Sequence, residues 1–378
     1  MARRTLAQHF ANLKDPRVVG RTKHRLDAIL AIAVVAMVCG CQSFEVIEDF
    51  ADARKVWFNT FLDLSNGIPS HDTLYRVFGQ LDPEVFAAGL AGWLAEWSAD
   101  WKLEPVAGPR QIAIDGKALR GSKAETFAKF THLVGAWATE DGLLLGQAVV
   151  DAKSNEIAAI PELLKVLELQ GALVTIDAAG CQKAIAEQIV AGGGDFLLTV
   201  KMNQPKLFES VEKNFLDGHE TGFENSVHSE SVKKERGHGR IEERHIHVIE
   251  NPVGLPEGWS GVKSVIQVHR ERTVKGKTSH TTHYYICSRN GSAEELGRLI
   301  RRHWAIENEL HWVLDVVFGE DANRTRDRNA SANLGAARRL AVSLLKRVEP
   351  KKSLKRKMFN ALMDLEFLKT LLAGISAI

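Results

Sequence analysis

Three acidic side chains occur in settings that suit metal-dependent chemistry on a phosphodiester. Asp115 and Asp177 each follow a short apolar run that is typical of a buried strand. Glu307 lies in the stretch Arg301–Asn308, which has helical spacing. Two carboxylates at strand ends and one on a later helix can converge on a pair of divalent cations. This is the minimum set of groups for cutting and rejoining a phosphodiester.

The two aspartates are expected to end neighbouring central strands of one sheet. Such strand ends lie about 5 Å apart. Two carboxylates at that distance repel each other unless cations lie between them, so a pair of Mg²⁺ or Mn²⁺ ions would relieve the electrostatic cost. Gly116, beside Asp115, would allow a phosphate to approach the backbone closely. The alternative is that each Asp only caps the turn after its strand.

Glu307 is the third acid that we select, although Glu309 and Asp315 are nearby. In a helix, Trp304, Glu307, His311 and Asp315 would fall on one stripe. The surrounding residues are largely apolar, which favours a functional carboxylate over the alternative of a solvated amphipathic helix.

Length, composition and cysteine spacing bound the class of protein. A chain of 378 residues predicts two or three domains. Its four cysteines have no zinc-like spacing and indicate small buried side chains in a reducing compartment. The longest apolar run, residues 28–41, is too short to span a bilayer, so no membrane partner is expected. We expect a cytoplasmic, nucleoid-associated protein.

Positive charge is unevenly distributed, although the net charge is only +2. Residues 322–357 hold twelve Lys and Arg against two acids, a local net charge of +10, and such a block attracts phosphates. A solvated helical face is the alternative. The turn Lys201–Pro205 is expected to bind a phosphate or a flanking base, unless it is an ordinary turn. The residues predicted to contact DNA are Lys117, Arg120, Lys201, Asn203, Gln204, Arg301, Arg302, His303, Asn308, Arg324, Arg326, Arg328, Arg338 and Arg339.

The hydrophobic pattern predicts an α/β chain whose first 105 residues are helical, either a helix-turn-helix or an all-helical packing unit. Ser70 is predicted to cap one helix, and Trp93, Trp97 and Trp101 to belong to the core. Strands are then expected over 111–115, 130–139, 143–150, 173–177 and 195–200, and helices over 154–169 and 181–191. The expected domains are a helical part over 1–105, the first part of the catalytic core over 108–204 and a β-rich insertion over 205–290, whose first part at 229–239 is expected to be mobile. The core is expected to end over 291–345, with a long helix that carries Glu307. A basic helical tail is expected over 346–378.

Several separate motifs resemble one family. They are Ala113–Lys117, Thr175–Lys183, Lys201–Pro205 and His303–Asn308, with Leu13–Arg17 and Ile68–Thr73 near the N-terminus. Together they resemble the H-repeat-associated (ISAs-type) insertion-sequence transposases of the DDE superfamily. The resemblance implies an RNase-H-like mixed sheet with helices on both faces, interrupted by a β-strand insertion. It maps the three catalytic, metal-binding acids onto Asp115, Asp177 and Glu307.

The resemblance also implies an activity and its partners. They are two-metal cleavage and strand transfer, with two Mg²⁺ or Mn²⁺ ions, on double-stranded DNA at terminal inverted repeats and target DNA, by a homodimer in the DNA complex. More distant relatives carry an Arg four residues before the Glu and a Lys seven after it, where this chain has His303 and Leu314. Two alternatives stay open: a metal-dependent nuclease that does not join strands, and a catalytically inactive DNA-binding remnant.

Overall fold

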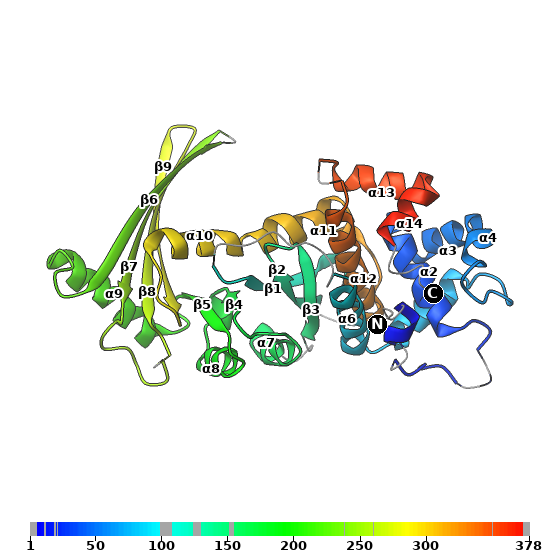
Figure 1. Cartoon of the computed structure of the whole chain (residues 1–378), viewed down its shortest axis with the longest axis horizontal. Coiled ribbons are helices and arrows are strands. Elements are labelled where there is room, and N and C mark those ends of the chain that lie inside the picture. Colours follow the sequence, from blue (N-terminus) through cyan, green and yellow to red (C-terminus); the bar gives the residue numbers. More distant parts are fainter. Residues whose placement is uncertain are drawn as a thin grey trace. The chain divides into compact units, whose positions relative to one another are not determined.

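The computed structural model describes residues 6–10, 13–18, 20, 22–98, 108–123, 130–150, 155–237, 239–259, 261–349 and 351–372. Within them, N-terminal helices precede a nine-stranded mixed sheet with the strand order β3-β2-β1-β4-β5-β9-β8-β7-β6 (Figure 1). The predicted α/β class, with a helical N-terminal part and a mixed sheet, is confirmed. No helix in the described part of the chain is both long and apolar enough to cross a membrane.

The chain divides into two compact units. Unit 1 contains residues 1–105, 116–155 and 306–378, and unit 2 contains residues 106–115 and 156–305. The division falls inside strand β1 (Gln111–Leu119), which therefore contributes residues to both units.

Unit 1 is built around helix α12 (Arg328–Arg347), which is buried along most of its length. This helix packs against α2 (Leu26–Val38), α5 (His71–Gln80) and α6 (Pro83–Ser98). N-terminal helices therefore share a core with a helix from the last quarter of the chain. The other α-helices of the unit are α1 (Leu6–His9), α3 (Phe44–Ala53), α4 (Lys55–Phe58), α11 (Trp312–Val316), α13 (Leu354–Met363) and α14 (Leu365–Leu371).

Two local predictions for the N-terminal helices are confirmed. The Ser70 hydroxyl accepts a hydrogen bond from the Thr73 backbone N–H at 3.4 Å and so caps α5. Trp93 and Trp97 are buried, with stacked rings whose centroids lie 5.8 Å apart. Trp101 lies outside the described residues.

Unit 1 also contains the predicted hairpin of β2 (Thr131–Ala138) and β3 (Leu143–Val150). Gly142 adopts φ +65° in its turn, and the Gly142 N–H donates to the Ala138 carbonyl at 2.8 Å. A positive φ is readily reached by glycine, which explains the turn at this position.

In unit 2, three strands run parallel. Strand β1 pairs with β4 (Leu173–Ile176), and β4 pairs with β5 (Asp195–Val200). The helices α7 (Glu156–Lys165) and α8 (Lys183–Ala191) lie on one face of this sheet, and α10 (Ala293–His303) lies on the other (Figure 1). Helices on both faces are therefore confirmed for this part of the sheet.

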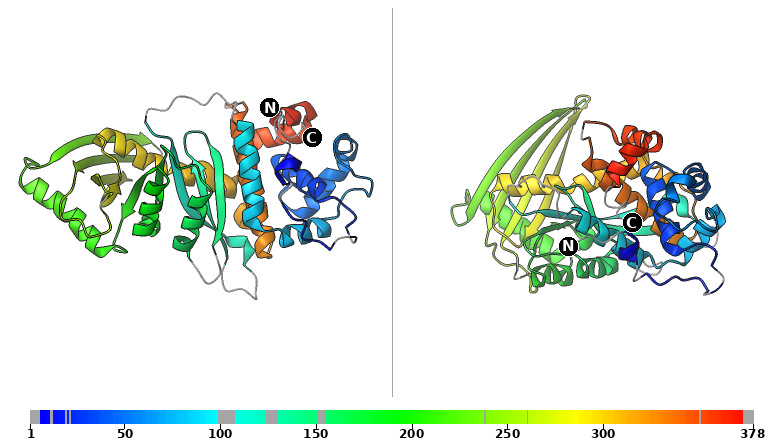
Figure 2. Two further views of the ribbon diagram at one scale, coloured as in Figure 1. Left: turned by 60° about the horizontal axis from the view of Figure 1, so that its bottom comes forward. Right: turned by 45° about the vertical axis from the view of Figure 1, so that its right-hand side comes forward.

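Four eleven-residue strands, each antiparallel to the next, extend the sheet of unit 2 beyond β5, and the first of them pairs antiparallel with β5. They lie side by side and curve together (Figure 2). They are β9 (Lys277–Cys287), β8 (Ser264–Val274), β7 (Arg240–Glu250) and β6 (Val227–Gly237), in that spatial order. Because β9 pairs with β5, the β-rich segment continues the central sheet and forms no second sheet of its own.

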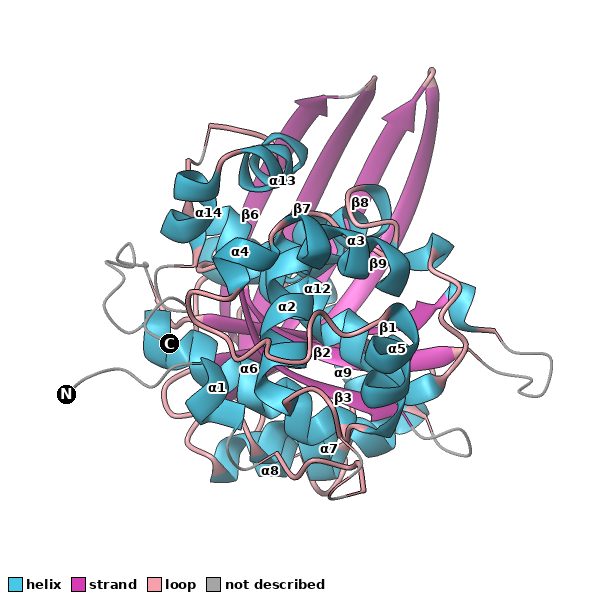
Figure 3. Ribbon diagram, turned by 90° about the vertical axis from the view of Figure 1, so that its right-hand side faces the viewer, coloured by secondary structure: helices cyan, strands magenta, loops and turns pink. Residues whose placement is uncertain are grey.

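The structure differs from the prediction for this segment in two places. Residues 229–239 were expected to be mobile, yet Ser229–Gly237 belongs to β6, which pairs with β7 over its whole length (Figure 3). Ladder hydrogen bonds use the backbone, so a polar sequence forms this strand as well as an apolar one. A helix, α9 (Pro205–Glu220), was also missed, although Leu207, Val211 and Phe215 are spaced by four and buried.

Candidate active site on the parallel strands

Asp115 and Asp177 lie at adjacent positions of neighbouring parallel strands. Ile114 of β1 and Ile176 of β4 are direct partners in the register, and each aspartate is the next residue. Both aspartates are half-buried. Neighbouring strands lie about 5 Å apart, so the two carboxylates start from adjacent backbone positions.

Alternation of side chains places both aspartates on the face covered by α10. Gln111 and Thr175 are an even number of residues before Asp115 and Asp177, and both contact that helix. The Gln111 amide donates to the Leu299 carbonyl at 3.0 Å, and Thr175 Oγ1 lies 2.9 Å from His303 Nδ1. The sheet therefore directs the two carboxylates to one side.

The position of Asp115 within its strand differs from the prediction. Strand β1 continues to Leu119, so Asp115 lies inside it and not at its end. Gly116 does not break the strand, and the buried residues Lys117 and Leu119 follow in alternation. The neighbouring strand β4 does end at Ile176, directly before Asp177.

Asp177 caps the short turn that follows its strand. Its Oδ1 accepts a hydrogen bond from the Ala179 backbone N–H at 3.0 Å, at the start of the 3₁₀ turn η3 (Ala178–Gly180). An ionised carboxylate has two oxygens and about four acceptor positions, so one such bond leaves capacity for a cation. The capping role and a metal-binding role are therefore compatible.

The turn after β5 holds the loop that follows Asp177. The Asn203 amide donates to the Ala178 carbonyl at 2.7 Å. The Gln204 amide donates to the Cys181 carbonyl at 2.9 Å and to Gln182 Oε1 at 3.2 Å. Asn203 and Gln204 were expected to contact DNA, but these donors are used within the protein. Lys201 is exposed, as that expectation requires.

His303 also departs from its predicted role as a DNA contact. Its Nδ1 is hydrogen-bonded to Thr175, and burial lowers the pKa of the imidazole to about 4. The ring is consequently neutral near pH 7 and does not act as a cation for a phosphate. Its role in this structure is to connect the end of α10 to strand β4.

Glu307 does not lie on the long α-helix that was expected. Helix α10 ends at His303, and Glu307 is an exposed residue of the π-helix η4 (Ile306–His311) in unit 1. Because a π-helix bonds residue i to residue i+5, the four-residue stripe predicted for Trp304 to Asp315 does not continue through it. Short π segments occur frequently at functional sites.

The acids near Glu307 in the sequence are each paired with a cation of unit 1. Glu309 lies 2.8 Å from Lys346 Nζ, and Asp315 lies 2.7 Å from Lys117 Nζ. Glu320 lies 2.9 Å from Arg339, within the short turn η5 (Glu320–Ala322), and Asp321 lies 3.5 Å from Arg120. These pairs give each of the four neighbouring acids a structural role.

Several cations predicted to contact DNA are buried instead, which corrects those assignments. Arg338 and Arg339 are each 1% exposed and share the buried carboxylate of Glu320, and burial lowers the pKa of Arg338 to about 10. Lys117 is 9% exposed and binds Asp315. The cause is their place in the sequence: each lies on an element whose other side chains form the core of unit 1.

The remaining predicted contacts differ in their exposure. Arg328 donates to the Val150 carbonyl at 2.8 Å. Arg302 is half-buried, and the exposed residues are Arg120, Arg301, Asn308, Arg324 and Arg326. In the basic tail, Lys357 is 3% exposed and donates to the Leu345 carbonyl, so this cation is not available at the surface.

A basic row that sequence reasoning missed lies on the α10 face of the long strands. Arg244 and Arg270 are direct partners on β7 and β8, on the same face as Asp115 and Asp177. Burial lowers the pKa of His283, and the charges of Arg270 and Lys201 lower it further, which indicates that these two cations flank it. Arg244 is paired with Glu235 and Glu242. The available signal was the alternation of basic residues along these strands.

Comparison with known proteins finds two family matches and finds relatives that cover nearly the whole chain. Residues 106–344 match the family described as "Transposase DDE domain", and residues 7–94 match the family described as "DDE_Tnp_1-associated". The "H repeat-associated putative transposase YhhI" of Escherichia coli (strain K12) is 35% identical over 99% of both chains. The "Putative transposase YncI" of Escherichia coli O157:H7 is 36% identical over 100% of this chain and 96% of its own.

Two further similarities are more limited. The "Inactive transposase YbfQ" of Escherichia coli (strain K12) is 34% identical over 21% of this chain and 95% of its own. Among solved structures, "Cryo-EM structure of piggyBac transposase synaptic complex with hairpin DNA (SNHP)" is similar with a TM-score of 0.40 and 10% identity, over 98% of this chain and 80% of that chain.

Proposed function

This chain belongs to the transposases with a DDE domain, and we propose that it cleaves DNA and transfers strands at the terminal inverted repeats of an insertion sequence. The observation that carries the proposal is the register of β1 and β4, which places Asp115 beside Asp177 on one face of the sheet. The substrate is double-stranded DNA, and the protein acts as a homodimer on the paired ends.

Asp115, Asp177 and Glu307 are the residues that would hold two Mg²⁺ or Mn²⁺ ions. The fit rests on the donor set, because carboxylate oxygens are the ligands these hard cations prefer and two of them start from adjacent backbone positions. When bound, such a pair of ions activates an attacking hydroxyl and stabilises the leaving oxygen of an in-line displacement.

The chain's own residues orient Asp177. The Ala179 N–H holds one carboxylate oxygen, and the amides of Asn203 and Gln204 fix the carbonyls of the same loop. An acid held in one rotamer loses less conformational freedom when it binds a cation.

The choice of Glu307 as the third acid follows from the motif His303–Asn308, and two acids near it in the sequence have structural partners. Glu309 is bound to Lys346, and Asp315 is bound to Lys117. Removing either acid from its pair would leave a cation without its counter-charge. Glu307 is exposed on an irregular helical turn, where a side chain can reach a ligand without disturbing the core.

The basic row on the α10 face provides a path for DNA phosphates. Lys201, Arg270 and Arg244 occupy the same side of the sheet as the two aspartates. Arg244 is already paired with Glu235 and Glu242, so Lys201 and Arg270 are the cations of this row that we assign to phosphates. DNA leaving the carboxylates along this face would meet these side chains.

The test uses a labelled duplex that carries the inverted repeat flanking the gene. With Mg²⁺ or Mn²⁺, the protein should nick the repeat end and form a joined product, and Asp115→Asn and Asp177→Asn should abolish both. The matched control is Asp195→Asn, because Asp195 begins β5 at the opposite end of the parallel strands and its bond from Ser288 can be kept by an amide oxygen.

Each alternative function has its own outcome in this experiment. Nicking without a joined product would identify a nuclease. Binding of the repeat without nicking of any DNA would identify an inactive DNA-binding remnant. Full activity in either folded aspartate variant would contradict the assignment of the site.

A further inference from the structure

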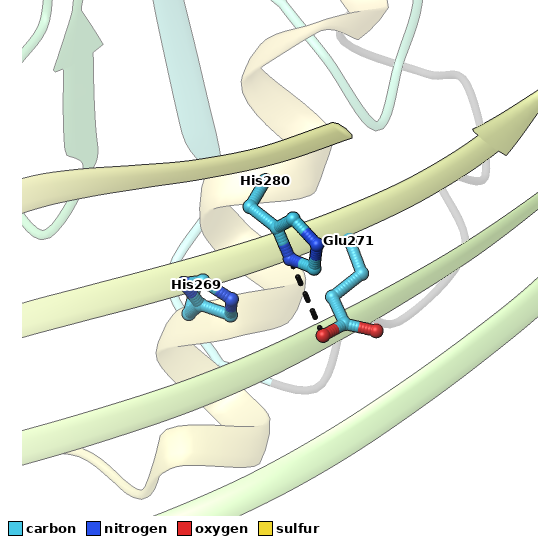
Figure 4. A group of neighbouring side chains, drawn as sticks. All are labelled: His269, Glu271 and His280. Atoms are coloured by element: carbon cyan, nitrogen blue, oxygen red, sulfur yellow. Dashed lines mark ion pairs between the residues drawn. The ribbon is translucent and has the colours of Figure 1, made fainter. Parts of the chain in front are cut away.

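A cluster of histidines lies on the outer halves of the long strands, away from α10. Glu271 of β8 is the direct partner of His280 on β9, and His269 of β8 is the partner of Thr282. Their parity is opposite to that of Arg270 and Thr281, so they project from the opposite face of the sheet from the aspartates. Figure 4 shows the side chains of His269, Glu271 and His280 gathered on neighbouring strands.

These three side chains are close enough to bind one ion. One ligand atom of each lies within 4.8 Å of those of the other two. His280 Nδ1 is 3.4 Å from Glu271 Oε1, and the rings of His269 and His280 are 5.8 Å apart. The cluster borders a shallow hollow of about 390 Å³ that is lined by His219, His245, His247, Gln267, His269, Glu271 and Thr282.

The orientation of His269 is a second observation that favours a metal ion. Its Nδ1 lies 3.1 Å from Thr282 Oγ1, which leaves Nε2 available as a ligand. Histidines that bind metals commonly use one ring nitrogen in this way to fix the orientation of the other. An exposed ion pair between Glu271 and His280 alone would contribute little and gives no role to His269.

We infer that His269, Glu271 and His280 bind one transition-metal ion of the Zn²⁺ class. Two imidazoles and one carboxylate form a known ligand set for zinc, with solvent completing a tetrahedral site. Mg²⁺ prefers oxygen ligands and is a poor match for two imidazoles. The site is separate from the carboxylates of the proposed catalytic function and does not depend on that function.

The consequence of binding would be local stability. The three ligands come from two adjacent strands near the turn that joins β8 to β9, so one ion would connect the strands where few core residues support them. Binding to the folded state alone raises its stability in proportion to ligand concentration. The ion would hold the outer end of this hairpin in register.

The test measures Zn²⁺ binding by calorimetry and Co²⁺ binding by visible absorption, on the full chain. Millimolar Mg²⁺ is present throughout to occupy the carboxylate site. We expect one equivalent to bind and to raise the melting temperature. Glu271→Gln and His280→Gln should each weaken binding by more than about tenfold. Loss of a residue that only orients a metal ligand already lowers metal affinity by about 10–100-fold.

The matched control is His283→Gln, because His283 is on the same strand as His280 but on the opposite face. This variant should bind Zn²⁺ as the natural chain does. Melting curves in metal-free buffer establish that each variant is folded. No binding by the natural chain, or equal binding by all variants, would overturn the inference and leave only an ion pair between Glu271 and His280. Neither result would affect the assignment of Asp115 and Asp177.

Discussion

His303 Nδ1 lies 2.9 Å from Thr175 Oγ1, which joins the last residue of α10 to the strand residue two positions before Asp177. The Gln111 amide reaches the same hydroxyl at 3.1 Å and the Leu299 carbonyl at 3.0 Å. One buried hydroxyl therefore connects β1, β4 and α10. Gln111, Thr175 and His303 precede the three proposed catalytic acids by four, two and four residues in the sequence.

Thr175→Val should destabilise the protein by about 1–3 kcal/mol. Valine has nearly the same shape but leaves the Gln111 amide and the His303 ring without their shared partner, and an unsatisfied buried polar group carries a cost of this size. Urea unfolding measures the change. Thr278→Val, at an exposed position of β9, should stay within about 0.5 kcal/mol. Equal effects in the two variants would contradict a special role for Thr175.

The stability contributed by His303 should fall as the pH falls from about 6.5 toward 4. Burial lowers the pKa of the folded imidazole to about 4, so the unfolded chain binds the additional proton in this range and is favoured by acid. Protonation of the unfolded chain at pH 5 corresponds to about 2 kcal/mol. His303→Asn should reduce the difference between the free energies of unfolding at pH 7 and pH 5 by about this amount. An unchanged difference would show that the ring is solvated.

Glu307→Gln should lower DNA cleavage by several orders of magnitude, because it removes one ligand from a two-metal site. Glu309→Gln should remain active, since Glu309 forms an ion pair with Lys346 and is not assigned to the metal site. Cleavage of the labelled repeat end is measured for both folded variants. The reverse result would transfer the catalytic role to Glu309.

Replacing Arg270 and Lys201 by Gln should reduce the salt dependence of DNA binding. Each lost phosphate contact should lower the slope of log affinity against log salt by roughly 0.9. The control is Lys234→Gln, an exposed cation on the opposite face, 2.7 Å from Glu243. A change of slope in the control alone would place the DNA on the histidine-rich face.

Glu320→Gln should destabilise unit 1 without changing that slope. It removes the carboxylate shared by two buried arginines, and breaking a buried pair costs about 3–5 kcal/mol. Thermal unfolding and salt titration of DNA binding are measured together. A steeper salt dependence in a fully stable variant would restore Arg338 and Arg339 as DNA contacts.

The sequence predicted the parallel strands well because their signals are local. The runs before Asp115 and Asp177 are apolar and bounded by turn residues, so strand positions followed directly. The adjacency of the two aspartates also followed, because β4 is the next parallel neighbour of β1. Predicting this adjacency required only the general order of strands and helices along the chain.

Other features depend on contacts between distant residues. Arg339 has the same side chain as an exposed DNA contact would have, and only its pairing with Glu320 inside unit 1 distinguishes the two. The π-helix around Glu307 differs from an α-helix by one residue in its hydrogen-bond spacing, which periodicity over six residues does not separate. The strand at Ser229–Gly237 forms because it pairs with β7, and no pattern in its own residues predicts that pairing.

The register of β1 against β4 also limits how the gene can change. Side chains alternate along a strand, so an in-frame deletion of one codon between Gln111 and Ile114 would turn Asp115 to the face opposite Asp177. A deletion of two codons would restore the direction of the side chain at the cost of a shorter strand. Copies of the element that lose a single codon here should therefore be inactive, and decay of the element can begin without a stop codon.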